Sequence, residues 1–512
     1  MKKRVFALIL CLCMLSVPTV RAADSVTAED DYPRYAPSGL FYQTKDNTLI
    51  VSDVWNKVLW TWRDGKYTAL AGETGVKGLD GEPVGVYNDS VPEHAFFMEP
   101  WAVAPFLEGY AVSDTAANVL RYVTDKAVYT LSGSGKEGME NGRGSKTSFR
   151  SPTGLATDAD GNLYIADTGN NAIRMLEPGG NVTTFRTGLS EPMGLCWHDG
   201  WLYVAETGKN RILRIKGSQM EVLAGTGTAT EDGAGYYGGF TDGPAARAAF
   251  DHPQGVAVAS DGTVYVADTL NHAIRAIRNG RVYTIAKSPN GLGMPVSPRS
   301  VLLHAKTLYA TDPFAQGIFT LSVEKKAYDD VKASAWYASA VDESTARGLC
   351  NGTSATEFSP EGSVTRAMFV TMLSRLHNSA DGTAVIDGDH AFSDVPADGW
   401  FSGAARWAAD GSIVNGVGEG QFAPQSDISR EQIVTMLLRY ARAQGLSTDA
   451  PDADLSDYTD HDSVSAWATE AMRWAVGRGI MKGSDGQLTP GASATRAQVA
   501  TLFINFMDAY GL

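Results

Sequence analysis

The segment YIADTGNNAIRML (residues 164–176) carries an acidic side chain in a setting that could do chemistry. Its Asp167-Thr168-Gly169 step can present a catalytic carboxylate, and acid catalysis of that type needs two aspartates that face each other and share a proton. An acid recurs at the same place in a repeated phrase along the chain. The six acids are Asp53, Asp114, Asp167, Glu206, Asp268 and Asp312. Their surroundings must decide between catalysis and architecture.

The phrase around each acid is an internal repeat. SPTGLATDADGNLYIADTGNNAIRMLEPGG (151–180) aligns with HPQGVAVASDGTVYVADTLNHAIRAIRNG (252–280), and four looser copies lie between residues 36 and 321. Each copy predicts four short strands joined by turns rich in Gly, Asn and Asp. Four strands at this period are typical of a propeller blade. We predict six blades over residues 35–326.

One acid per blade leaves no facing pair, so the repeat argues against an aspartic protease. Each acid stands at the end of a blade's second strand. A carboxylate there can accept hydrogen bonds from the free N–H groups of the turn that follows. We therefore interpret Asp167 and its five counterparts as architecture.

The best-preserved copies also carry a family signature. LAGTG (223–227) is followed by FTDGPAARAAFDHPQGVAV (240–258) and DGTVYVADTLNHAIR (261–275). This order of phrases resembles the NHL-repeat family. The resemblance implies an all-β, six-bladed NHL-type propeller.

A different repeat occupies residues 327–512. Three copies align at 328–378, 392–442 and 455–507. Each begins with Asp-Val or Asp-Tyr and continues into an amphipathic helix that contains Trp and Ala. A Gly-rich loop then leads to Phe-x-Pro or Leu-Thr-Pro, and a Ser or Thr N-cap with an Arg after it opens a second apolar helix. The spacing from Asp457 to Trp467 in the third copy is longer than from Asp330 to Trp336 or from Asp394 to Trp400.

These three copies resemble S-layer homology (SLH) domains. The resemblance implies an all-α trio whose grooves hold a pyruvylated secondary cell-wall polysaccharide. A guanidinium can bind a planar carboxylate through two parallel hydrogen bonds, and the first turn of a helix offers free N–H groups to an anion. The flat face of a Trp suits a sugar ring. The expected polysaccharide-binding residues are Arg366, Arg430, Arg496, Trp336, Trp400 and Trp467.

Both residue types have a structural alternative. The three arginines could instead form salt bridges with Asp330, Asp394 and Asp457, and the three tryptophans could fill the bundle core. In either case we expect those aspartates to organise the loops rather than to bind an acidic polymer.

The N-terminus reads as an export signal. Lys2, Lys3 and Arg4 precede an apolar run, and Val20-Arg21-Ala22 supplies a small-x-small cleavage site. The chain has a net charge of −15, which argues against nonspecific nucleic-acid binding. No later stretch is apolar enough for membrane insertion.

These features predict a multidomain chain. The expected parts are a signal peptide (1–22), an acidic segment (23–34), the propeller (35–326) and SLH domains at 327–380, 391–444 and 454–512. We expect a secreted protein of the cell wall or S-layer of a Gram-positive-type bacterium, anchored non-covalently through the SLH domains.

The propeller's role has two interpretations. It is a binding platform for an unknown protein or glycan, or it is a hydrolase or lyase with a metal ion on its axis, where acidic turns could hold Ca²⁺. The eight His show no close metal-ligand spacing. We assign no catalytic residue, no metal ligand and no cofactor, and leave enzyme activity open. His or carboxylate side chains from several blades that converge on the channel would favour the enzyme. A channel lined by apolar or unpaired polar residues would favour the platform.

Long Gly-rich insertions join successive blades at 72–97, 133–149 and 225–250. Loops of this length on a rigid scaffold often bind ligands, and Tyr236, Tyr237 and Phe240 would give the last one an aromatic patch. The alternative is that all three are connectors without a ligand.

Overall fold

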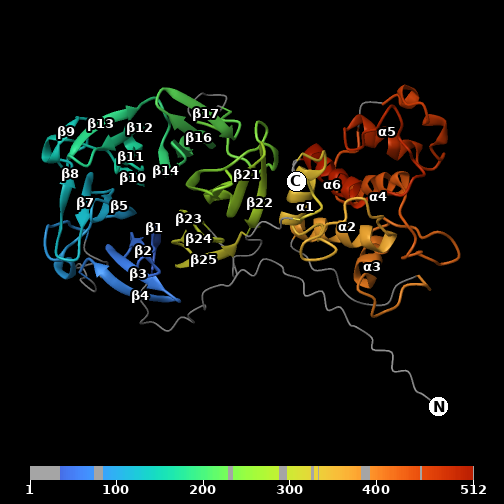
Figure 1. The fold of residues 1–512 in the computed structure, drawn as a ribbon, viewed down its shortest axis with the longest axis horizontal. Coiled ribbons are helices and arrows are strands. Elements are labelled where there is room, and N and C mark those ends of the chain that lie inside the picture. The colour runs from blue at the N-terminus through green and yellow to red at the C-terminus, as the bar shows by residue number, and fades with distance from the viewer. Residues whose placement is uncertain are drawn as a thin grey trace, which may run out of the picture.

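The computed structural model consists of a β-propeller followed by a bundle of helices (Figure 1). It describes residues 35–73, 85–228, 235–287, 297–323, 328–332, 334–381, 392–449 and 453–510. The expected signal peptide and acidic segment (1–34) lie outside the described residues.

Within the described residues, six antiparallel sheets form the propeller, and the main strands of each follow the order of the sequence. Short Gly-, Asn- and Asp-containing turns favour this meander because they tolerate a positive φ. The first three blades are β1 (Pro37–Gln43), β2 (Thr48–Asp53), β3 (Val58–Arg63) and β4 (Lys66–Ala71); β5 (Pro100–Phe106), β6 (Gly109–Asp114), β7 (Val119–Val123) and β8 (Val128–Ser132); and β10 (Pro152–Thr157), β11 (Leu163–Asp167), β12 (Ala172–Leu176) and β13 (Asn181–Arg186), with β9 (Gly142–Arg143) on its outer edge.

The last three blades differ in their edges. They are β14 (Pro192–His198), β15 (Trp201–Glu206), β16 (Arg211–Lys216) and β17 (Gln219–Ala224); β19 (Pro253–Val258), β20 (Val264–Asp268), β21 (Ala273–Arg278) and β22 (Arg281–Lys287), with β18 (Gly243–Pro244) outermost; and β23 (Val301–His304), β24 (Thr307–Asp312) and β25 (Gly317–Ser322). Blade six has three strands within the described residues. The predicted six-bladed all-β fold is confirmed.

The blades are joined at the axis by their first strands, which contact one another in ring order. A hydroxyl residue next to the repeated acid fixes the register. Thr168 donates to the carbonyl of Pro192 at 2.7 Å, and Thr207 donates to that of Pro253 at 2.6 Å. The ring closes from blade six to blade one, where Thr311 donates to the carbonyl of Ser38 at 2.8 Å.

Short 3₁₀ turns connect several strands. They are η1 (Pro92–His94), η2 (Gly144–Lys146), η3 (Thr168–Asn170), η4 (Thr207–Lys209) and η5 (Thr269–Asn271); η6 (Leu455–Asp457) and η7 (His461–Ser463) lie in the bundle.

Six helices of the described residues form the bundle, which we call the helical trio because it is built from three repeated units. They are α1 (Ala338–Ala346) and α2 (Arg366–Asp381) in unit one, α3 (Ser402–Asp410) and α4 (Arg430–Ala443) in unit two, and α5 (Thr469–Gly477) and α6 (Arg496–Tyr510) in unit three.

The units share one hydrophobic core and pair cyclically. Helix α2 packs on α3, α4 on α5, and α6 on α1, so each pair combines two units. A ring of three backbone hydrogen bonds joins the units: Val364 N to Ala494 O, Ala494 N to Ile428 O, and Ile428 N to Val364 O, at 2.9–3.1 Å. The trio is therefore closed on itself rather than a row of independent units.

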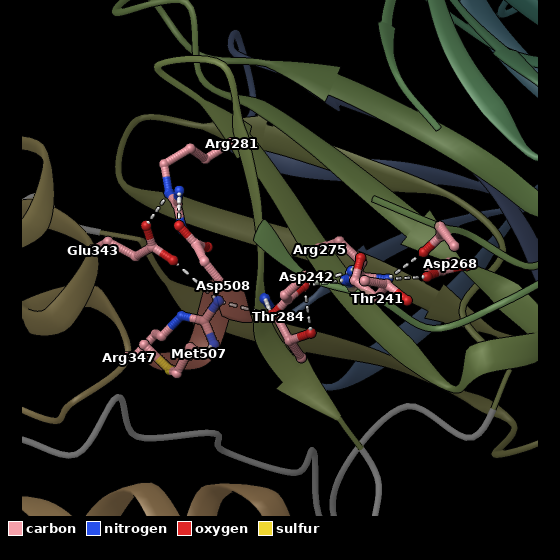
Figure 2. Close-up of polar contacts among 11 residues, drawn as sticks. Thr241, Asp242, Asp268, Arg275, Arg281, Thr284, Glu343, Arg347, Met507 and Asp508 are labelled. Carbon is pink, nitrogen blue, oxygen red and sulfur yellow. Dashed lines mark hydrogen bonds and ion pairs between the residues drawn. The ribbon is translucent and has the colours of Figure 1, made fainter. Parts of the chain in front are cut away.

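The propeller contacts the trio through blade five. Figure 2 shows Arg281 of β22 between Glu343 of α1 and Asp508 of α6. Its Nε lies 2.6 Å from Glu343 Oε2, and its Nη1 lies 2.6 Å from Asp508 Oδ2. Arg278 pairs with Asp342 at 3.2 Å nearby.

A second contact joins the interiors of the two parts. Asp242, in the third insertion, accepts from Arg275 at 2.5 Å and lies 3.0 Å from Arg347 of the trio (Figure 2). The backbone N–H of Thr284 also donates to Asp242, at 2.7 Å. Asp242 is only 4% exposed. Its buried carboxylate is shared between Arg275 of the propeller and Arg347 of the trio.

Candidate functional site

The six repeated acids all lie at the end of the second strand of a blade and are fully buried. Asp167 accepts from the backbone N–H of Arg150 at 2.8 Å, from the side chain of Asn170 at 2.8 Å and from Arg174 at 2.9 Å. Burial raises the pKa of Asp167, and the donors from Arg150, Asn170 and Arg174 oppose that rise.

The backbone N–H groups that donate to the repeated acids are not always those of the following turn, contrary to expectation. In blades one and six the following turn does donate, as Phe314 N to Asp312 at 2.9 Å illustrates. In blades three and five the backbone donor instead precedes the first strand, as Asp251 N to Asp268 at 2.8 Å illustrates. The reason is that the turn after Asp268 forms its own 3₁₀ bond, from His272 N to Thr269 O. The acid therefore joins the start of a blade to the end of its second strand.

Buried arginines on the third strand complete this arrangement, and the sequence analysis missed them. Arg121, Arg174 and Arg275 are 0% exposed, and each lies seven residues after its blade's acid. In blade one, Trp60 stands at that spacing and donates its indole N–H to Asp53 at 2.9 Å. The recurring spacing of acid and arginine is the signal that could have found them.

The insertions supply the other partners of these arginines. Asp89 lies 3.0 Å from Arg121, and Asn141 accepts from Arg174 at 2.7 Å. The second and third insertions also add β9 and β18 to blade edges. In the third, Phe240 lies against Lys287 and Arg275, with the Lys287 amine 3.6 Å from the ring centroid. These contacts favour the connector interpretation, although Tyr237 is 52% exposed.

In the helical trio, one aspartate per unit holds the loop that precedes the second helix. Asp330 accepts from Phe358 N and Ser359 N at 2.8 and 2.6 Å, and Asp394 accepts from Phe422 N and Ala423 N at 2.7 Å each. Burial opposes ionisation of Asp394, but these N–H groups and the Arg366 guanidinium outweigh it and lower its pKa.

The third unit corrects the sequence alignment. Asp460, not Asp457, accepts from Leu488 N and Thr489 N, at 2.8 and 2.7 Å. Asp457 ends the 3₁₀ turn η6 instead. With Asp460 in the aligned position, the spacing to Trp467 is one residue longer than in the other units. The gap in the third unit is therefore longer, as expected, but the aspartate assigned to it was wrong.

The three arginines do not form the salt bridges of the structural alternative. Their Nε atoms donate to backbone carbonyls of the next unit in the cycle: Arg366 to Phe422, Arg430 to Leu488 and Arg496 to Phe358, at 2.7–2.8 Å. Because Phe422 donates its N–H to Asp394 and its carbonyl accepts from Arg366, both backbone groups of this residue are fixed. Each arginine thus joins two units at their boundary.

The first-turn N–H groups are also occupied, contrary to expectation. Arg366 N donates to Ser426 O, Arg430 N to Ala492 O and Arg496 N to Gly362 O, at 2.8–3.1 Å. An anion near these helices would therefore contact the guanidinium groups rather than the backbone.

Terminal nitrogens of the three guanidiniums remain for another partner. Arg430 and Arg496 each use one of them, on the carbonyls of Lys482 and Asn351, whereas no described residue accepts from either terminal nitrogen of Arg366. The arginines are 4–8% exposed, and burial lowers their pKa. Nearby aspartates, Asp394 for Arg366 and Asp460 for Arg430, oppose this effect.

The tryptophans lie on the surface. Trp336, Trp400 and Trp467 are 66%, 65% and 57% exposed, so the core-packing alternative was wrong. Trp336 and Trp400 contact their neighbours Tyr337 and Phe401 edge-on. The aromatic and ionic contacts within the described part of the chain join none of the three tryptophans to one of the three arginines.

The described residues contain neither a candidate metal cluster nor a candidate membrane-spanning helix. No group of three or more His, Cys, Asp or Glu lies close enough together to hold a metal ion. None of the described helices combines the length and apolarity needed to cross a bilayer.

Comparison with known families identifies both parts. The profile of the Teneurin NHL domain matches residues 130–301, and that of the S-layer homology domain matches residues 327–368, 391–434 and 457–500. The NHL match covers blades three to five and their surroundings, while the first blade lies outside it.

Individual relatives share only part of their length with this chain. An endoglucanase of Bacillus sp. (strain KSM-635) is 33% identical over 34% of this chain and 18% of its own, and the surface-layer 125 kDa protein of Lysinibacillus sphaericus is 28% identical over 37% and 16%. This chain therefore spans less than a fifth of either relative. The structure of virginiamycin B lyase from Staphylococcus aureus is similar at 14% identity and a TM-score of 0.39, over 57% of this chain and 96% of the lyase. A similarity of that size carries no functional assignment.

The fold and these matches define the class: the chain carries an NHL-type β-propeller followed by three S-layer homology domains. It is a cell-surface protein located at the cell wall or S-layer, and its SLH domains support anchoring there.

Proposed function

We propose that the helical trio binds a pyruvylated secondary cell-wall polysaccharide and thereby holds the propeller outside a Gram-positive-type bacterium. The observation that carries this proposal concerns the repeated arginine of each unit. Its Nε donates to a backbone carbonyl, while at least one of its terminal nitrogens has no acceptor among the described residues. A guanidinium held in this way is already oriented, so little rotamer entropy is lost when it binds a carboxylate. The three exposed tryptophans, one in each unit, offer apolar faces for sugar rings.

The parts of the chain follow from this proposal. Residues 1–22 would direct export, 23–34 would precede the propeller at 35–326, and the anchoring domains would occupy 327–380, 391–444 and 454–512. The propeller would serve as a binding platform for a protein or glycan. Supporting this role, Ser38 Oγ of β1 and Gln254 Oε1 of β19 are buried and have no hydrogen-bond partner among the described residues, which favours a platform over a metal enzyme.

The test is wall fractionation of cells that produce arginine variants. Removing one charge-assisted contact should cost about 1.5–3 kcal/mol at that groove, and three grooves on one polymer mask single losses by avidity. We expect each single change to Ala to weaken retention and the triple change at Arg366, Arg430 and Arg496 to release the protein into the medium.

The matched control is Arg406→Ala, which removes a partly exposed arginine of α3 that pairs only with Asp410 among the described residues. It should leave retention unchanged. A folded triple variant that stays on the wall would contradict the proposed role of the arginines.

A further inference from the structure

The three arginines of the helical trio differ in what their terminal nitrogens contact. The Nη2 of Arg430 donates to the carbonyl of Lys482 at 3.2 Å, and the Nη2 of Arg496 donates to the carbonyl of Asn351. Neither terminal nitrogen of Arg366 has an acceptor among the described residues. The groove of Arg366, where unit one meets unit two, therefore keeps both terminal nitrogens for a ligand.

The loop that faces Arg366 differs in its backbone from the other two loops. Asn415 stands in this loop at the position of the two residues whose carbonyls accept in the other grooves, and a glycine follows in each unit. Gly416 has a φ of +73°, in the left-handed region, whereas its counterparts Gly352 and Gly483 lie outside that region. A change in the sign of φ turns the preceding peptide plane. The carbonyl of Asn415 is therefore oriented differently from its two counterparts.

One aromatic position explains why this loop differs. In unit one the hydroxyl of Tyr328 accepts from the backbone N–H of Gly352 at 2.8 Å and so fixes that peptide. Tyr458 stands at the same position in unit three, but unit two has Phe392 there. Phe392 has no hydroxyl that could accept from the N–H of Gly416. The sequence of unit two therefore leaves its loop peptide in another orientation.

Arg366 is nevertheless held in place and open to solvent. Its Nε donates to the carbonyl of Phe422 at 2.8 Å, and its guanidinium carbon lies 5.0 Å from the centroid of the Phe422 ring. Its two unpaired terminal nitrogens are not among the fully buried atoms, so the small exposed part of this side chain includes them. An oriented guanidinium with two accessible terminal nitrogens can donate in parallel to both oxygens of one carboxylate.

We infer that the groove of Arg366 is the principal carboxylate site of the trio, and that Phe392 is the residue that makes it so. Arg430 and Arg496 each keep one terminal nitrogen without an acceptor, which suits a single contact with the polymer. This inference rests on the proposed polysaccharide binding and says which groove recognises the acidic group.

The test is calorimetric titration of the exported chain, residues 23–512, with a methyl glycoside that carries a cyclic pyruvate ketal. The methyl ester of the same compound keeps the shape and lacks the charge. We expect one tight site that prefers the acid to the ester by roughly tenfold or more, since a second charge-assisted hydrogen bond is gained only there. Arg366→Ala should remove this site, whereas Arg430→Ala and Arg496→Ala should reduce only the weaker binding. The control Arg406→Ala should bind as the parent chain does.

Variants at Phe392 test the cause without touching an arginine. Phe392→Tyr supplies a hydroxyl for the N–H of Gly416 and should weaken binding of the acid severalfold while binding of the ester stays the same. Phe392→Leu adds no hydroxyl and should keep the tight site. A residue that only packs the loop would change acid and ester binding alike. If Arg366→Ala fails to fold by circular dichroism, Phe392→Tyr carries the test.

The outcomes separate this inference from the proposed function. Equal loss of acid binding in the three arginine variants, or an unchanged tight site in Phe392→Tyr, would overturn the inference and leave polysaccharide binding standing. A parent chain that binds neither the acid nor intact cell walls would remove the proposed function and the inference with it.

Discussion

Arg281 should hold the propeller against the helical trio, and its removal should separate the two parts. Its side chain is 17% exposed and contacts Glu343, which is 4% exposed, and Asp508, which is 19% exposed. Burial opposes the charge on Arg281, but Asp508 and Glu343 outweigh this effect and raise its pKa. Arg281 is therefore charged at neutral pH, and Arg281→Met would leave the carboxyl groups of Glu343 and Asp508 short of a partner.

The magnitude follows from the contacts that remain. Breaking a buried ion pair by removing one partner costs about 3–5 kcal/mol. Glu343 keeps Arg347 at 3.0 Å, and water can reach Asp508, so we expect the low end, about 3 kcal/mol. That corresponds to a change of roughly a hundredfold in the equilibrium between docked and separated parts. Glu343→Gln combined with Arg281→Met should show a coupling free energy in a double-mutant cycle.

Energy transfer between dyes on the two parts measures this equilibrium. Engineered cysteines at exposed Met220 and Ser484 can be labelled selectively, because burial raises the pKa of Cys196 and Cys350 to about 11 and leaves few thiolates there. We expect one narrow distance distribution for the parent chain and for Arg247→Met, and a broad one for Arg281→Met. Identical distributions in the parent and Arg281→Met would refute the reasoning.

Three further predictions concern the repeats. Asp167→Ala should lower the unfolding free energy of the propeller by about 3–5 kcal/mol, because it leaves the buried Arg174 without its carboxylate partner. Ligand binding by the remaining fold should persist. Unchanged stability in chemical denaturation would contradict the architectural role. The pKa of Asp394 is lower in the folded trio than in the unfolded chain, where an aspartate titrates near 4, so its ionised form stabilises the trio above that pH. This stabilisation is lost as the pH falls through the folded pKa. Denaturation measured between pH 2 and 5 should lack that part of the pH dependence in Asp394→Asn. Arg366→Lys should recover only part of the wall binding lost in Arg366→Ala. An ammonium group keeps the charge, but it cannot donate to the Phe422 carbonyl and also give a carboxylate two parallel hydrogen bonds. Full recovery in cosedimentation would argue against a bidentate contact.

The sequence was sufficient for the architecture because both parts are repeats. A hydrophobic pattern that recurs six times fixes strands and turns locally, and every blade carries a buried acid with a hydroxyl residue beside it. The surface position of Trp336, Trp400 and Trp467 was one of two open alternatives, because a Trp at helical spacing fits a core as well as a surface.

The partners of the repeated residues could not be predicted, since they come from other units. The Nε of Arg496 donates to Phe358, 138 residues earlier in the chain. The misplaced aspartate has a local cause: the third unit has several acids between residues 454 and 462. The aromatic residue two positions before each loop aspartate, Tyr328, Phe392 and Tyr458, would have identified Asp460.

The contact between propeller and trio was also beyond the sequence. It combines Asp242 from an insertion, Arg281 from blade five, Glu343 from α1 and Asp508 from α6. No repeat pattern links these positions, and each taken alone reads as an ordinary surface charge.

The most direct test of the central claim is cosedimentation of the exported chain with purified cell walls. Residues 23–512 should pellet with walls that retain their pyruvylated polymer and remain in solution with walls from which the acidic groups have been stripped. Residues 23–326 serve as the control without the trio and should stay in solution in both cases. Equal retention of residues 23–512 on intact and stripped walls would contradict anchoring through the three arginines.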